Sequence, residues 1–146
     1  MRAIGIILAG GNNSRMKELS RKRAVGAMPI AGSYRAIDFA LSNMSNSHIQ
    51  KVAVLSQYNA WSLNEHLSSS KWWDFGRKQG GLFVFTPSIT SDNGFWYRGT
   101  ADAIAQNIAF LKKSHEPYVV IASADAVYKM DYNKVLEKHV ETGADL

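Results

Sequence analysis

Residues 4–15 read IGIILAGGNNSR, an almost wholly apolar run followed by glycines, small polar residues and an arginine. An apolar run of this length that stops at turn-forming residues predicts a buried strand of a parallel sheet. Gly10 and Gly11 permit a tight turn with outward-pointing N–H groups, and Arg15 adds a positive charge. Such a turn at the end of a strand is typical of a phosphate cradle. A turn that only joins strand to loop is equally compatible with these residues.

The composition limits the class of protein. The chain has 146 residues, enough for one domain or a large piece of one, and 46% of them are hydrophobic, as in folded proteins. No apolar run approaches the roughly 20 residues that cross a bilayer, and no signal-peptide pattern precedes the first strand, so we expect a cytoplasmic protein without membrane association. The absence of cysteine excludes thiolate chemistry. A net charge of +5 suits an anionic ligand.

Along the rest of the chain, apolar runs typical of strands alternate with segments whose apolar residues recur at helical spacing. Residues 16–33 show no period and predict a long ordered loop. Further strands are predicted at 52–55, 82–85 and 118–122, a turn at 91–94, and helices at 34–44, through Leu63 and Leu67, from 100 to 111 and from 131 to 143. This alternation predicts an α/β fold, a mostly parallel sheet flanked by helices. Residues 143–146 would lead into another strand, so we expect the amino-terminal part of a longer protein.

Two polar positions are candidate ligand contacts. Asp125 directly follows the most apolar predicted strand, where open α/β sheets bind ligands, and a carboxylate there can hold Mg²⁺ against phosphates. A cap for the local turn is the alternative role for Asp125. Thr100 is predicted to cap the helix at 100–111, with Asp102 in its first turn. The start of a helix can also bind an anion, but capping alone explains Thr100.

The remaining unusual residues favour structural roles. Trp72 and Trp73 could stack on the bases of single-stranded nucleic acid, but adjacent tryptophans are more typical of a loop that covers the edge of a sheet. Six of the cations lie between Arg15 and Arg35, either on a solvated face or beside the anion site. The four histidines have no metal-ligand spacing, and the glycines lack the dinucleotide-binding pattern. We therefore expect no nucleic-acid partner.

Five segments carry a family resemblance: LAGGNNSRM at 8–16, YRAIDFALSNMSNS at 34–47, VLSQYN at 54–59, WYRGTADAIAQN at 96–107 and ASADAVYKMDY at 122–132. Together they resemble the sugar-nucleotide pyrophosphorylases, and among these the ADP-glucose pyrophosphorylases (glucose-1-phosphate adenylyltransferases) of glycogen biosynthesis. The resemblance implies a nucleotide-diphospho-sugar transferase domain of Rossmann-like, GT-A-like type. Residues 1–146 would be its amino-terminal part, with the rest of that domain and a left-handed β-helix domain beyond residue 146.

The resemblance also implies a reaction and a site. The reaction converts ATP and glucose 1-phosphate to ADP-glucose and diphosphate by in-line attack, which requires positioning and charge neutralisation. Arg15 and Asp125 would be catalytic, with Mg²⁺ on Asp125. The implied nucleotide-binding residues are Leu8, Ala9, Gly10, Gly11, Gln57, Tyr97, Gly99 and Thr100. The sugar-phosphate site would lie beyond residue 146.

Several positions depart from the pattern of active members. Asn13 replaces a glycine of the first loop. Active members read R-A-K-P-A where this chain reads RAVGA at 23–27, so Val25 replaces the lysine that reaches the transferring phosphates. The family's G-D-H is Ala124-Asp125-Ala126 here. Loss of one preorganised donor typically lowers a rate about 10²–10³-fold.

These departures favour a regulatory or weakly active subunit, similar to the GlgD type of the bacterial glycogen pathway. Such a subunit would bind ATP, ADP-glucose or glucose 1-phosphate and modulate a catalytic paralogue in a hetero-oligomer, expected to be a tetramer. A competent adenylyltransferase that uses Lys22, or a lysine from beyond residue 146, is the alternative. A nucleotide- or nucleic-acid-binding module is a more remote one.

Overall fold

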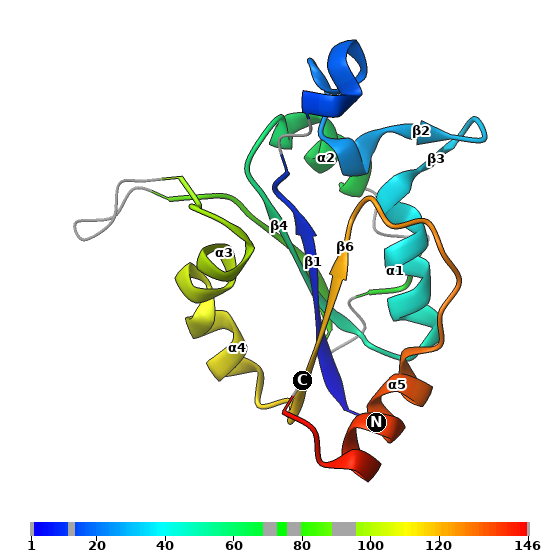
Figure 1. Cartoon of the computed structure of the whole chain (residues 1–146), viewed down its shortest axis with the longest axis vertical. Coiled ribbons are helices and arrows are strands. Elements are labelled where there is room, and N and C mark those ends of the chain that lie inside the picture. The colour runs from blue at the N-terminus through cyan, green and yellow to red at the C-terminus, as the bar shows by residue number, and fades with distance from the viewer. Residues whose placement is uncertain (1, 12–13, 69–72, 76–79, 89–95, 146) are drawn as a thin grey trace.

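A parallel sheet forms the centre of the computed structural model, which describes residues 2–11, 14–68, 73–75, 80–88 and 96–145. Four of its strands are hydrogen-bonded in the order β5-β4-β1-β6, and every pair is parallel. Their bounds are β1 Ala3–Ala9, β4 Lys51–Ser56, β5 Gly81–Phe85 and β6 Tyr118–Ser123. The predicted α/β fold with a parallel sheet is confirmed (Figure 1).

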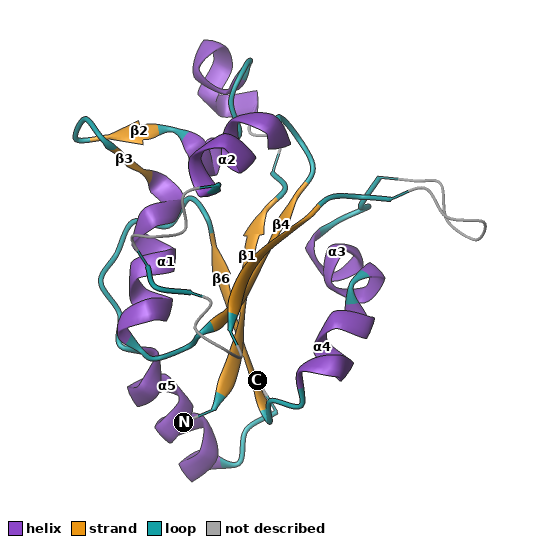
Figure 2. Cartoon of the chain, turned by 180° about the vertical axis from the view of Figure 1, so that it is seen from behind, coloured by secondary structure: helices purple, strands orange, loops and turns teal. Residues whose placement is uncertain are grey.

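Helices cover both faces of this sheet (Figure 2). Helices α1 (Ala36–Asn46), α2 (Ala60–Leu67) and α5 (Tyr132–Thr142) pack on one face, around Ile7 and Val54. Helices α3 (Thr100–Gln106) and α4 (Ile108–Ser114) pack on the other, around Ile6 and Leu55. Because neighbouring residues of a strand point to opposite faces, the consecutive apolar residues Ala3–Ala9 of β1 and 52–55 of β4 serve both cores.

The register places three strand ends at one level. Leu8 of β1 pairs with Leu55 of β4 on one side and with Ser123 of β6 on the other. Residues that directly follow these strands therefore lie side by side at the carboxyl edge of the sheet. This edge was predicted to hold the ligand.

The segment predicted as a loop over 16–33 contains short elements. It forms the 3₁₀ turns η1 (Ser14–Ser20) and η2 (Val25–Ala27), and strand β2 (Pro29–Ile30) pairs antiparallel with β3 (Tyr34–Arg35). Tyr34 and Arg35 thus belong to a hairpin, not to the first helix. The helix begins at Ala36, where the side chain of Asp38 accepts a hydrogen bond from the Arg35 N–H at 2.8 Å.

The single helix predicted over 100–111 is two helices. Asn107 interrupts it with φ −106° and ψ 15°, and its side-chain amide donates to the Ala103 carbonyl at 2.8 Å. A side chain that bonds the backbone of the preceding turn favours such a break. The spacing of apolar residues predicts one buried stripe along this helix, formed by Ala101, Ile104, Ala105, Ile108 and Leu111. That prediction is wrong in part, because Ala101, Ala105 and Ile108 are exposed. The residues that pack inward are Ala103, Ile104, Phe110 and Leu111.

The last strand and the last helix lie where the sequence predicts them, but part of the strand is more exposed than its apolar residues predict. Strand β6 lies at an edge of the described sheet, so Val119 and Ile121 are 42% and 50% exposed instead of buried. Helix α5 begins and ends where predicted, with the Asp131 side chain accepting from the Asn133 N–H and Gly143 in a left-handed conformation (φ 61°). No helix within the described ranges has the length and apolarity to cross a membrane.

The aromatic segment has a packing role where the structure describes it. Trp73 and Phe75 are buried in the larger core, and the Trp73 carbonyl accepts a hydrogen bond from Ser45 Oγ at 2.8 Å. This confirms the structural role predicted for Trp73 and removes its ring as an exposed base-stacking platform. Trp72 and the turn predicted at 91–94 lie outside the described residues.

Candidate functional site

A cavity of about 590 Å³ opens at the carboxyl edge of the sheet. This volume is within the range of small-molecule sites. Its walls come from the ends of β1, β4 and β6, from η2 and from the start of α3. The lining residues are Leu8, Ala9, Gly10, Gly11, Val25, Gly26, Leu55, Gln57, Tyr97, Gly99, Thr100, Ala103, Ser123, Ala124 and Asp125.

Every residue predicted to bind the nucleotide lies on this wall, together with Asp125 and the divergent positions Val25 and Ala124. Leu55, Ala103, Ser123 and Gly26 line the cavity as well and were not predicted. Leu55 and Ser123 could have been found from the strand register, since both pair with Leu8. Ala126 is not among the lining residues, and Asn13 and the side chain of Arg15 lie outside the description.

The first wall is the turn that follows β1. Gly10 and Gly11 both face the cavity, and a Cβ placed on Gly11 would meet no atom of the described residues within 4 Å. Neither glycine is among the described residues with positive φ. The backbone path therefore does not require glycine here. Glycine instead leaves the main chain open to the cavity, as a ligand held by backbone N–H groups would need.

The second wall carries an unpaired acceptor. The Oε1 atom of Gln57 is buried and has no hydrogen-bond partner among the described residues, and Gln57 lines the cavity directly after β4. A buried carbonyl oxygen without a partner costs on the order of 1–3 kcal/mol. A ligand that donates a hydrogen bond to this oxygen would offset that cost. Gln57 is therefore suited to bind an N–H donor such as an exocyclic amine.

The third wall is formed by the residues just before α3 and by the start of that helix. Tyr97 is buried, and its hydroxyl accepts a hydrogen bond from the Asn107 side chain at 3.0 Å. The prediction that Thr100 caps this helix is wrong, because the cap position is Gly99, with no side-chain cap bond. The Asp102 carboxylate instead accepts from the Arg98 N–H at 2.9 Å. Capping therefore does not account for Thr100, which faces the cavity.

Two exposed rings lie beside this third wall. Tyr58 and Trp96 are stacked, with ring centroids 5.7 Å apart and an interplanar angle of 15°. Each ring immediately precedes or follows a lining residue, Gln57 or Tyr97. The pair therefore joins the segment after β4 to the segment before α3.

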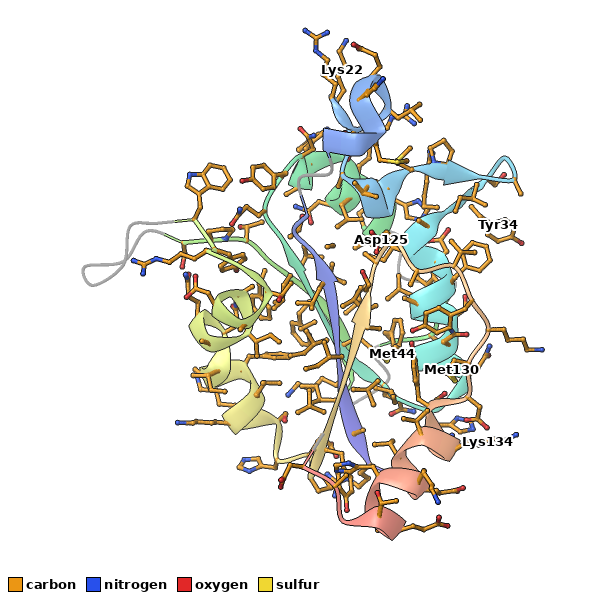
Figure 3. All side chains as sticks on the ribbon, in the orientation of Figure 1. Lys22, Tyr34, Met44, Asp125, Met130 and Lys134 are labelled. Carbon is orange, nitrogen blue, oxygen red and sulfur yellow. The ribbon has the colours of Figure 1, made fainter. Side chains whose placement is uncertain are left out.

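The fourth wall carries Asp125, which lies in the turn after β6 at the upper end of that strand in Figure 3. The carboxylate is exposed and accepts a hydrogen bond from the Ser123 hydroxyl. No cluster of three or more potential metal-binding side chains is found among the described residues. One carboxylate beside a ligand's phosphates still fits Mg²⁺, which keeps several waters and commonly uses one or two protein carboxylates. The arrangement does not fit a metal held by protein groups alone.

The charge of the cavity is unusual for a site that is expected to hold phosphates. Among the lining side chains that the structure describes, Asp125 is the only charged one. Val25 takes part in the wall with an apolar side chain. Lys22 lines a separate hollow with Glu18, Arg21 and Arg23, and Figure 3 places it far from Asp125. Lys22 therefore does not supply the missing positive charge in this arrangement.

Comparisons with known proteins agree with this architecture. A family model described as nucleotidyl transferase matches residues 4–146. Proteins described as glucose-1-phosphate adenylyltransferase are 46% identical in Clostridium novyi, 48% in Clostridium kluyveri and 45% in Halalkalibacterium halodurans. These matches cover 97% or 98% of this chain, which spans about 37% of the length of each relative.

A solved structure shows the same fold. The structure is described as a glucose-1-phosphate thymidylyltransferase from Bacillus anthracis in complex with sucrose. It superposes with a TM-score of 0.74 at 18% identity, over 95% of this chain and 50% of that one. At this identity the likeness concerns the fold alone.

Proposed function

The chain belongs to the nucleotidyl transferase family, and from this premise we propose that it is part of a subunit of glucose-1-phosphate adenylyltransferase. The reaction of that enzyme joins ATP and glucose 1-phosphate into ADP-glucose and diphosphate in glycogen biosynthesis. We place this chain with the regulatory or weakly active, GlgD-like subunits, acting in the cytoplasm beside a catalytic paralogue in a tetramer. The 46% identity to adenylyltransferases over 142 residues supports the reaction class.

The absence of a positive charge on the described cavity wall carries the regulatory part of this proposal. Phosphoryl transfer requires the protein to neutralise charge on the transferring group, and active members use a lysine at the position of Val25. Val25 faces the cavity but can neither donate a hydrogen bond nor carry a charge. The residues implied for the nucleotide site meet at one cavity, while position 25 lacks the lysine that the resemblance implies for active members.

Nucleotide binding uses groups that remain. The open backbone at Gly10 and Gly11 is suited to the phosphates, and the unpaired Gln57 oxygen is suited to the amino group of adenine. Asp125 would hold Mg²⁺, which when bound shields the charge of the phosphates. The stacked rings of Tyr58 and Trp96 belong to residues that adjoin the lining residues Gln57 and Tyr97 in sequence.

A turnover assay tests the proposal. Purified protein with ATP, glucose 1-phosphate and Mg²⁺ should bind ATP or ADP-glucose, but turn over well below the ~1–10³ per second of ordinary enzymes. The protein should also change the rate or the effector response of a catalytic adenylyltransferase subunit mixed with it. Turnover in the ordinary range would overturn the regulatory assignment and favour the competent enzyme. Failure to bind either nucleotide would overturn the nucleotide site itself.

A further inference from the structure

Gly26 and Ala124 contact each other at the cavity, one from η2 and the other from the turn after β6. A Cβ atom placed on Gly26 would lie 2.9 Å from the Cβ of Ala124. Carbon atoms in packed interiors stay further apart than this, at about 3.5–4.0 Å. A side chain at position 26 therefore cannot coexist with the methyl group of Ala124 unless one segment moves.

Lack of space, and not backbone conformation, explains this glycine. The described glycines with positive φ are Gly32, Gly81 and Gly143, and Gly26 is not among them. An alanine at position 26 is thus compatible with the backbone dihedral angles. The next nearest atoms, the Ala124 carbonyl oxygen and the Ile37 Cβ, would lie at an ordinary contact distance of 3.7 Å. The Ala124 methyl group is the main obstacle.

Hydrogen bonds hold both sides of this contact. The Ala124 N–H donates to the Leu8 carbonyl at 3.0 Å, and Ala124 is 2% exposed. On the other side, the Ala24 N–H donates to Ser62 Oγ of α2 at 3.2 Å, and η2 also packs against α1. Because the clash would be between two Cβ atoms, no side-chain rotation can relieve it. Relief requires a shift of η2 or of the turn after β6.

We infer that Gly26 and Ala124 are a size-matched pair of positioning residues that sets the separation between Val25 and Asp125 across the nucleotide site. Each member of the pair directly adjoins one of these two lining residues in sequence, so a displacement at the contact moves the cavity wall. The inference deepens the proposed function and rests on it for the identity of the ligand. Gly26 and Ala124 act through their neighbours and need not touch the nucleotide themselves.

A double-mutant cycle tests the pair. Gly26→Ala, Ala124→Gly and the double variant are compared for the affinity of ATP with Mg²⁺ by calorimetry, at a temperature where all are folded by circular dichroism. Gly26→Ala should weaken binding about tenfold or more, since small misplacements in a site are costly. The double variant should return to within about threefold of wild type, a coupling in the range seen for residues in contact. Ala124→Gly alone removes a methyl group and creates no clash, so it should weaken binding less than Gly26→Ala does.

Gly5→Ala is the matched control. A Cβ on Gly5 would also meet an atom at 2.9 Å, but that atom is the Sδ of the flexible Met44 side chain, away from the cavity. This variant should lower the thermal midpoint without changing nucleotide affinity, and Ala124→Gly should not rescue it. If Gly26→Ala does not fold, folding and binding by the double variant would still support the pair, and its failure to fold would overturn it.

The outcomes separate this inference from the proposed function. The size-matched pair alone would be overturned if Gly26→Ala bound ATP as tightly as the wild type. It would also be overturned if Gly26→Ala bound more weakly and the added Ala124→Gly substitution did not restore the affinity. Absence of ATP and ADP-glucose binding by the wild type would overturn the proposed nucleotide site, and with it the positioning role.

Discussion

Replacement of Asp125 by asparagine should strengthen nucleotide binding when no metal is present. Asp125 is the one charged side chain on the described cavity wall, and it has the same sign as a phosphate. Two unit charges about 4 Å apart interact by ~1 kcal/mol in water and by ~4 kcal/mol at an effective dielectric constant near 20. Because Asp125 is exposed, the lower part of this range applies, ~1–2 kcal/mol. We therefore expect Asp125→Asn to bind ATP about 5–30-fold more tightly in EDTA.

Addition of Mg²⁺ should reverse the order of the two proteins. The wild type should gain affinity, because a divalent cation between the carboxylate and the phosphates turns repulsion into attraction. Asp125→Asn loses the anionic ligand, so its affinity should change much less on addition of Mg²⁺. Calorimetric titrations of ATP into each protein, in EDTA and in excess Mg²⁺, measure all four affinities.

Asp131→Asn is the matched control for this experiment. It changes the net charge by the same amount, and asparagine remains a good N-cap for α5. Asp131 does not line the cavity, so its replacement should leave the metal dependence of ATP binding intact. The reasoning is refuted if Asp125→Asn binds ATP in EDTA no more tightly than the wild type, or if it keeps the wild-type response to Mg²⁺.

Three further variants test other parts of the molecule. Val25→Lys should tighten ATP binding and raise any adenylyltransferase turnover, and no gain in either would show that other changes silence the site. Asn43→Ala should lower the free energy of unfolding by ~2–3 kcal/mol in urea titrations, because its buried amide bonds both the Tyr128 carbonyl and the Met130 N–H. Burial raises the pKa of Tyr132 above its usual value near 10. The free energy of unfolding should therefore be unaffected by this group below pH 10 and should fall above pH 10 by up to ~1.4 kcal/mol per pH unit. Tyr132→Phe should reduce this dependence of stability on pH.

The sequence predicted the parts of the fold that depend on local pattern. The apolar run at 4–9 and the alternation of strand and helix were sufficient to predict a parallel sheet with a ligand edge. The break at Asn107 could not be predicted from periodicity, since it depends on a side-chain bond to Ala103 that only the folded helix shows. The exposure of Ile121 likewise depends on which strand lies at the edge of the described sheet, and strand order is not encoded locally.

The candidate site was predictable to a similar extent. Motif positions led to residues that the structure brings to one cavity, but their roles in binding stay predictions. Gly26 was interpreted only as a loop residue, because its contact with Ala124 joins segments almost one hundred positions apart. Thr100 was predicted to cap α3, but the cap position is Gly99, and the Asp102 carboxylate accepts from the N–H of Arg98 just before it. Threonine and aspartate both suit the start of a helix, so residue type alone does not separate these positions.

The strand register explains how a cavity can persist while its charges change. Leu8 pairs with Leu55 and with Ser123, so Gly10, Gln57 and Asp125 follow three strands that end at one level. This alignment depends on backbone hydrogen bonds and on the apolar residues of the sheet, none of which carries the charge of the site. A valine at position 25, where the resemblance implies a lysine in active members, leaves those bonds intact. A chain of this fold can therefore lose phosphoryl-transfer chemistry and keep a nucleotide-sized opening, and affinity and turnover must be measured separately to establish which of the two remains.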